Sequence, residues 1–209
     1  MEFQSLNYIY QPSGKADAHT LLLLHGTGGN ETDLLSLAEH YGHEVNVLSL
    51  RGNVTESGMP RFFKRLGMGI FDEADLTFRT DEMVAFIKEL AVKEGFDIEK
   101  LVALGYSNGA NIAGATLVKY PDLLAGAILF RPMQPFKSMP LLSVKEARPV
   151  FATSGKFDPT VDPAATVVYM SALKKAGFDL EDHFLPTSHN LTKEDIQLSV
   201  DWFVKNFGE

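Results

Sequence analysis

A serine enclosed by glycines is the residue of this chain most suited to chemistry. Ser107 lies in residues 105–109, Gly-Tyr-Ser-Asn-Gly, which follow the pattern G-x-S-x-G. Residues 101–104 before it are apolar and of strand type, and residues 110–119 after it have helical spacing and many small side chains. A strand that turns sharply into a helix through this pattern holds the serine hydroxyl out at the end of a sheet. The pattern therefore predicts Ser107 as a nucleophile.

A serine nucleophile needs a base, and the base needs a carboxylate to orient it. Where such a turn carries the nucleophile, the chain order is serine, acid, histidine. Two histidines follow Ser107. His183 lies within an alternating segment, which predicts a solvent-facing strand residue, whereas His189 lies between that segment and the last helix. Because sites of α/β proteins form at the carboxyl ends of strands, we predict His189 as the base.

Two aspartates compete for the role of the acid. Asp158 follows the expected strand 149–154, which places it at the same end of a parallel sheet as Ser107. Asp162 directly precedes Pro163, which is typical of the N-cap of a helix. We favour Asp158 over Asp162. Its role would be to hold the histidine tautomer and to stabilise the imidazolium that forms.

An oxyanion hole requires two backbone amides near the nucleophile. The first belongs to Asn108, and the second is expected from the glycine-rich loop 25–29, where Thr27 is the best-placed donor. A phosphate-binding loop is the alternative interpretation of this loop. Glu31 stands where the third glycine of such a loop belongs, and Arg51 occupies the place of an acidic ribose ligand. We therefore favour the oxyanion loop over nucleotide binding.

Strand-like and helix-like segments alternate along the chain. Residues 51–75 are the longest irregular stretch, and their phenylalanines argue against disorder. The alternation predicts an α/β fold with a mostly parallel central sheet and helices on both faces, formed by residues 1–209 as a single domain. The expected strands are 3–10, 20–25, 45–50, 101–104, 125–130, 149–154 and 178–185, and the expected helices are 30–41, 80–94, 110–119, 163–176 and 192–207.

The composition excludes several other classes of protein. A net charge of −8 without a basic run argues against nucleic acid and against stable membrane association. The absence of cysteine excludes a thiol nucleophile, a disulfide framework and thiolate metal sites, and no histidine pair has metal-ligand spacing. The start of the chain lacks the features of a signal peptide, and the aliphatic run 21–24 is too short to span a bilayer. A cytoplasmic protein is the simplest expectation.

These segments together resemble the carboxylesterase/phospholipase family of small α/β-hydrolases, which includes acyl-protein thioesterases. The resemblance covers nearly the whole chain and implies neither a metal nor an organic cofactor. Four segments carry it: residues 22–31 resemble the oxyanion segment of the family, 105–110 its elbow, 157–159 its acid loop and 188–191 its histidine loop.

Two further segments narrow this resemblance, and two residues depart from it. Residues 61–65 and 71–76 are similar to a bacterial branch that includes hydroquinone-specific hydrolases. Ser188 stands where glycine usually precedes the histidine, and Asp162 replaces a common proline. We expect the first departure to shift the backbone of His189 slightly, and the second to have little effect.

The combined features predict a serine carboxylester hydrolase that cleaves small or short-acyl esters through an acyl-enzyme, with a small-molecule ester as its partner. An acyl thioesterase or lysophospholipase, and a hydrolase-fold binding protein without turnover, stay open as alternatives, and so does a homodimer. Residues 131–148 are too few for a helical lid. Five side chains are the candidate lining of the substrate pocket, with packing in the core as the alternative: Met59, Phe62, Phe63, Phe71 and Met133.

Overall fold

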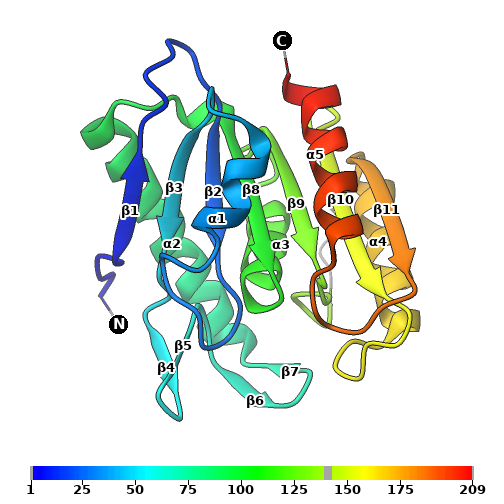
Figure 1. Cartoon of the computed structure of the whole chain (residues 1–209). Coiled ribbons are helices and arrows are strands. Elements are labelled where there is room, and N and C mark those ends of the chain that lie inside the picture. The colour runs from blue at the N-terminus through cyan, green and yellow to red at the C-terminus, as the bar shows by residue number, and fades with distance from the viewer. Residues whose placement is uncertain (1, 139–142, 209) are drawn as a thin grey trace.

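A seven-stranded sheet forms the centre of the computed structural model, which describes residues 2–138 and 143–208. The strand order is β1-β3-β2-β8-β9-β10-β11, and only β1 runs antiparallel to its neighbour (Figure 1). The strands are β1 (Tyr8–Gln11), β2 (Thr20–Leu24), β3 (Asn46–Leu50), β8 (Leu101–Tyr106), β9 (Gly126–Phe130), β10 (Pro149–Gly155) and β11 (Asp179–Leu185). Every residue of β2, β3 and β9 is buried, as expected for parallel strands covered on both faces. The predicted α/β architecture is confirmed.

Helices cover both faces of this sheet. They are α1 (Leu35–Ala38), α2 (Glu73–Glu94), α3 (Asn108–Lys119), α4 (Pro163–Ala176) and α5 (Lys193–Phe207), with short 3-10 turns at Glu39–Tyr41 and Ile98–Lys100. Figure 1 shows α1 and α5 in front of the sheet and α2, α3 and α4 behind it. The hydrophobic core is divided accordingly, with Ile87 and Leu173 in one cluster and Leu37 and Trp202 in the other. The sheet is thus held between two apolar layers.

Side-chain caps fix where the longer helices begin. The Asp72 side chain accepts a hydrogen bond from the backbone of α2, and Asp162 does the same for α4, where Pro163 takes the first helical position. Thr192 and Asp195 form a reciprocal capping box at the start of α5. The predicted N-cap role of Asp162 is confirmed.

Three of the predicted elements in the first half of the chain have different bounds in the structure. The expected helix 30–41 shrinks to α1 and one 3-10 turn, because the Asn30 side chain accepts from the backbone and hydroxyl of Thr32 and stabilises a turn. The expected helix 80–94 begins earlier, at Glu73, directly after its cap. The first strand begins only at Tyr8.

The stretch 51–75 is more regular than predicted. It contains one hairpin of β4 (Val54–Glu56) and β5 (Met59–Arg61), and another of β6 (Arg65–Gly67) and β7 (Ile70–Phe71). Ser57 and Gly58, with φ of 51° and 81°, form the two-residue turn of the first hairpin, a backbone suited to the twist of paired strands.

Of the predicted short loop 131–148, residues 139–142 lie outside the described residues.

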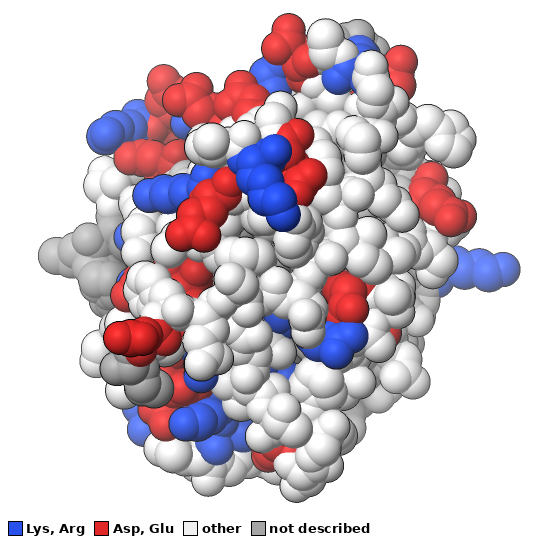
Figure 2. All heavy atoms as spheres, turned by 90° about the vertical axis from the view of Figure 1, so that its left-hand side faces the viewer, with Lys and Arg blue, Asp and Glu red and all other residues white. Residues whose placement is uncertain are grey.

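Charges on the surface beside β1 are mixed. Figure 2 shows basic and acidic side chains next to one another on this face rather than gathered by sign. On α2, Asp81 pairs with Lys119 at 2.7 Å and Glu82 pairs with Arg79 at 2.7 Å.

Within the described residues, no helix combines the length and the apolar character needed to cross a membrane.

Candidate active site

Ser107 occupies a strained turn between β8 and α3. Its φ of 52° is in the left-handed region, which costs energy for any residue with a side chain. Glycines on either side permit the turn: a Cβ on Gly105 would lie 2.5 Å from the Gly109 carbonyl oxygen, and one on Gly109 would lie 1.9 Å from that of Leu24. The serine is thereby held at the carboxyl end of the sheet, as the G-x-S-x-G pattern predicts.

The structure brings Ser107, His189 and Asp158 together from three separate loops. Ser107 Oγ lies 2.9 Å from His189 Nε2, and His189 Nδ1 lies 2.7 Å from Asp158 Oδ2. The Asp158 side chain is fully buried, whereas that of His189 is 26% exposed. A hydroxyl, an imidazole and a carboxylate joined in this order can act as nucleophile, general base and orienting acid.

The loop after β10 keeps Asp158 charged. Asp158 Oδ1 accepts from the Thr160 backbone at 2.8 Å and from its hydroxyl at 2.6 Å. Burial raises the pKa of Asp158, but the hydrogen bonds from Thr160 and His189 outweigh burial and leave the pKa below its ordinary value. Asp158 can therefore face a protonated His189 as a carboxylate. Asp162, the competing acid, caps α4 instead.

Two unpaired backbone amides lie beside the serine. Among the described residues, the amides of Thr27 and Asn108 have no hydrogen-bond partner. Both residues line a cavity of about 200 Å³ together with Ser107 and His189. Asn108 is also the first residue of α3, where amides are free and the helix dipole is positive. These amides are available to an oxyanion.

Residues 60–63 hold in place the two segments that carry these amides. The turn at residues 57–58 returns the chain over the glycine-rich loop, so that Phe62 and Phe63 are 2% and 0% exposed, in the core rather than in the cavity wall predicted for them. The Phe62 ring packs against His25, with centroids 4.7 Å apart. Three hydrogen bonds tie this segment to the two loops: Gly28 N to Pro60 O at 2.9 Å, the Arg61 guanidinium to Thr27 Oγ1, and Phe62 N to Asn108 Oδ1 at 2.7 Å.

His25 is a structural residue of the glycine-rich loop. Its Nδ1 donates to the Gly26 carbonyl at 2.6 Å, and its Nε2 accepts from Gly52 N at 3.1 Å. Burial lowers its pKa, so the ring is neutral at neutral pH. Both ring nitrogens are thus committed to the backbone.

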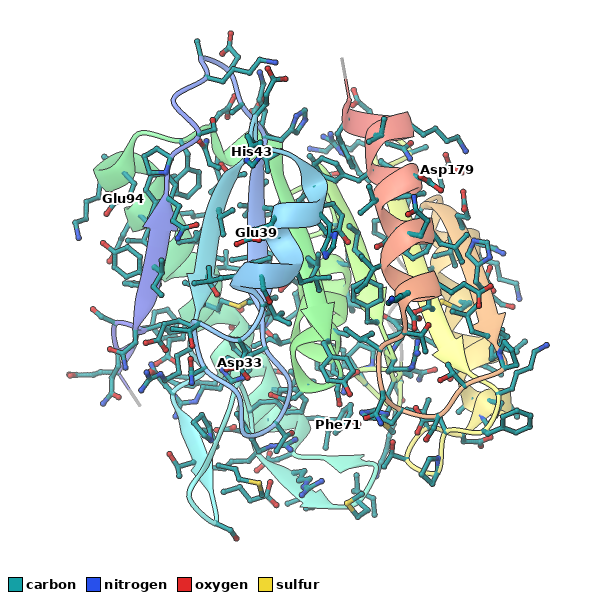
Figure 3. The ribbon with its side chains drawn as sticks, in the orientation of Figure 1. Asp33, Glu39, His43, Phe71, Glu94 and Asp179 are labelled. Atoms are coloured by element: carbon teal, nitrogen blue, oxygen red, sulfur yellow. The ribbon has the colours of Figure 1, made fainter. Side chains whose placement is uncertain are left out.

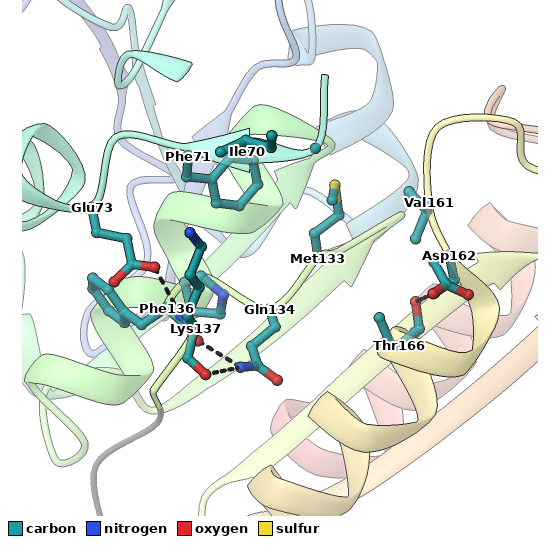
Figure 4. A pocket seen from close by; sticks show the side chains of 13 residues that line it. Ile70, Phe71, Glu73, Met133, Gln134, Phe136, Lys137, Val161, Asp162 and Thr166 are labelled. Carbon is teal, nitrogen blue, oxygen red and sulfur yellow. Dashed lines mark hydrogen bonds between the residues drawn. The ribbon is translucent and has the colours of Figure 1, made fainter. Parts of the chain in front are cut away.

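Of the predicted apolar lining, Phe71 and Met133 border the cavity. Phe71 lies below the carboxyl ends of the central strands in Figure 3. Met59 is absent from the lining and packs instead over Gly28, where a Cβ would lie 3.7 Å from Met59 Cγ. Phe71 and Met133 also border a second hollow of about 240 Å³, shown in Figure 4, which extends between them and Val161.

Arg131, which the sequence analysis missed, holds the loop that carries His189. Its side chain is fully buried directly after β9. Nε donates to the Ser188 carbonyl at 3.2 Å and Nη2 to the Asn190 carbonyl at 2.9 Å, so the guanidinium holds the backbone on both sides of His189. Asp195 accepts from both terminal nitrogens, at 2.7 and 2.8 Å. The two partners are 64 residues apart, and no local pattern signals the contact.

Breaking this buried ion pair should destabilise the fold. We expect Arg131→Met to lower the free energy of unfolding by about 3–5 kcal/mol, because it leaves the Asp195 carboxylate buried without its counter-ion. Urea unfolding measures the loss. The control is Lys119→Met, which removes a partly exposed pair with Asp81 and should cost below about 1 kcal/mol. Equal losses in the two variants would contradict the role of Arg131.

Comparison with known proteins identifies the family. The alpha/beta hydrolase fold pattern matches residues 19–148. The chain is 42% identical over 198 residues to MhqD of Bacillus subtilis (strain 168), named as a hydrolase without a stated substrate, and the match covers 95% of this chain and 98% of MhqD. A Bacillus cereus carboxylesterase superposes with a TM-score of 0.93 at 44% identity, over 97% of this chain and 95% of the esterase. A Mesorhizobium loti carboxylesterase superposes with a TM-score of 0.88 at 26% identity, over 95% of this chain and 94% of that esterase. The chain therefore belongs to the α/β-hydrolase family, as a small member of carboxylesterase/phospholipase type.

Proposed function

We propose that this protein is a serine carboxylester hydrolase. The hydrogen-bonded series of Ser107, His189 and Asp158, with separations of 2.9 and 2.7 Å, carries the proposal. The cavity beside Ser107 gives an ester room to bind, and the similarity to carboxylesterases supports the same reaction class.

The geometry supports a two-step mechanism through an acyl-enzyme. His189 Nε2 takes the Ser107 proton while Oγ attacks the ester carbonyl carbon, and the resulting oxyanion accepts hydrogen bonds from the amides of Thr27 and Asn108. His189 then gives the proton to the leaving alcohol. In the second step His189 takes a proton from a water molecule, whose oxygen attacks the acyl carbon. His189 then returns this proton to Ser107 Oγ as the bond between Oγ and the acyl carbon breaks, which releases the acid. Asp158 stabilises the imidazolium in both steps.

We propose small or short-acyl esters as substrates. The wall near Ser107 contains Phe71 and Met133, and the hollow in Figure 4 extends this apolar wall for a limited distance. Each added methylene gains about 0.8 kcal/mol only while it is buried against apolar wall. Once the wall ends, a longer acyl chain gains nothing.

A series of p-nitrophenyl esters from acetate to palmitate tests this proposal. We expect kcat/KM to reach its maximum at or below hexanoate, without activation by lipid interfaces. Acyl thioesters and a lysophospholipid are measured beside them under the same conditions. An efficiency that keeps rising through dodecanoate and palmitate would favour a thioesterase or lysophospholipase. Absence of hydrolysis for every ester would favour a binding protein.

A further inference from the structure

The cavity beside Ser107 has a basic lining in an acidic protein. The chain has 27 acidic and 19 basic residues, yet the cavity is lined by three arginines, and none of its described lining residues is Asp or Glu. On the surface in Figure 2, by contrast, basic and acidic groups lie next to one another. The three arginines are Arg61, Arg65 and Arg131.

Counter-ions balance this charge only in part. Arg131 forms a paired site with Asp195, so it adds no net charge. Arg61 and Arg65 share one carboxylate: Arg61 Nε lies 3.3 Å from Glu56 Oε2, and Arg65 Nε donates to the two oxygens of Glu56 at 2.9 and 3.0 Å. Two guanidinium groups and one carboxylate leave one positive charge in this group of three side chains, on the side of the cavity formed by Arg61 and Arg65.

Arg61 is the more constrained of the two. Its side chain is 4% exposed, and its hydrogen bonds go to neutral oxygens, the Phe63 carbonyl and Thr27 Oγ1. Burial, together with the nearby charge of Arg65, lowers the pKa of Arg61, which means that its surroundings disfavour its positive charge. An anion in the cavity would stabilise this buried cation.

We infer that Arg61 and Arg65 bind a carboxylate of the substrate, so that the preferred small ester carries an anionic group. This inference rests on the proposed ester hydrolysis and names its substrate class. Guanidinium groups suit carboxylates because their donors match the two oxygens. Since Arg61 also bonds to Thr27, the carboxylate would lie on the Thr27 side of the reacting carbonyl. It can belong to the acid part of the ester or to its alcohol part.

Two pairs of esters with equal shape and different charge test the inference. Monoethyl succinate and ethyl levulinate differ by a carboxylate on the acyl side, and 4-acetoxybenzoate and 4-acetoxyacetophenone differ by one on the alcohol side. We expect kcat/KM, corrected for the hydroxide-catalysed rates, to be at least about tenfold higher for the anionic member of one pair. This ratio should fall as NaCl is raised to about 0.5 M, because salt screens the attraction.

Variants of two neighbouring residues distinguish binding of a carboxylate at this site from a general effect of the charge of the protein. Arg65→Gln should lower the anionic-to-neutral ratio by about tenfold. Lys64→Gln removes the same charge from a side chain that is 56% exposed and outside the cavity lining, so the ratio should stay as in the wild type. Arg61 is left intact because it bonds to Thr27.

The outcomes distinguish this inference from the proposed function. Hydrolysis of neutral esters with a ratio near one in both pairs would overturn the inference alone. If no ester is hydrolysed, the proposed function fails. Titration calorimetry with succinate and 4-hydroxybenzoate then tests whether the cavity binds a carboxylate. Saturable binding weakened by Arg65→Gln would support it, and its absence or its insensitivity to Arg65→Gln would overturn it.

Discussion

Ser107→Ala is expected to lower kcat for a short-chain ester by about three to six orders of magnitude, as removal of a serine nucleophile does elsewhere. Without Oγ no acyl-enzyme forms, while the amides of Thr27 and Asn108 still stabilise an oxyanion, so a small residual rate over water remains. Steady-state hydrolysis of p-nitrophenyl butyrate by purified wild type and variant measures the loss. The thermal unfolding midpoint of the variant should not fall, since the only hydrogen bond that the alanine removes among the described residues is the one from the Ser107 side chain to His189.

A fluorophosphonate probe provides the complementary measurement. Wild-type protein should gain a single adduct on Ser107, detected by peptide mass spectrometry, and Ser107→Ala should gain none. Ser171→Ala on the exposed side of α4 is the matched control and should react as wild type does. Near wild-type turnover in Ser107→Ala would falsify its role as the nucleophile. An unreactive wild-type protein would favour a hydrolase fold that binds without turnover.

Proximity of the three site residues could be predicted because it depends on chain order and sheet direction. Each of them follows a strand of a parallel sheet, and the carboxyl ends of such strands meet at one edge. Ser107 has in addition a local signal, since its strained φ requires the flanking glycines. The cap of α4 at Asp162 was equally local, which is why the choice of Asp158 could be made from the sequence.

Features that depend on tertiary packing could not be predicted in this way. Phe62 and Phe63 looked like lining residues of a loop, but the hairpin turn at residues 57–58 carries them into the core. That turn contains a Ser-Gly pair, which is itself a sequence signal for a turn. Arg131 and Asp195 gave no signal, because the ion pair that holds the His189 loop forms only when β9 and α5 come together. The position of these hydrophobic and charged residues relative to the cavity thus depends on contacts between segments far apart in the sequence, which local patterns do not show.

Asp158→Asn should lower kcat by about four orders of magnitude, whereas Asp162→Asn should leave it within a few-fold of wild type. An asparagine at 158 can still accept the hydrogen bonds from Thr160, so the loop is expected to fold. It cannot stabilise the imidazolium, and its amide group favours the wrong tautomer of His189. At 162, asparagine caps a helix about as well as aspartate, so α4 keeps its start.

The comparison of these two variants decides between the aspartates because both lose one negative charge within four residues of each other along the chain. General electrostatic effects on the acidic protein are therefore similar, and a difference in kcat reports the specific contact of Asp158 with His189 Nδ1 at 2.7 Å. Both variants are assayed with p-nitrophenyl butyrate, and their urea unfolding midpoints are compared to exclude loss of folded protein. A far larger loss in Asp162→Asn than in Asp158→Asn would show that the acid has been assigned to the wrong aspartate. Equal, small losses would mean that His189 is oriented without a carboxylate, with Thr160 Oγ1, 2.9 Å from Nδ1, as the group left to hold the ring.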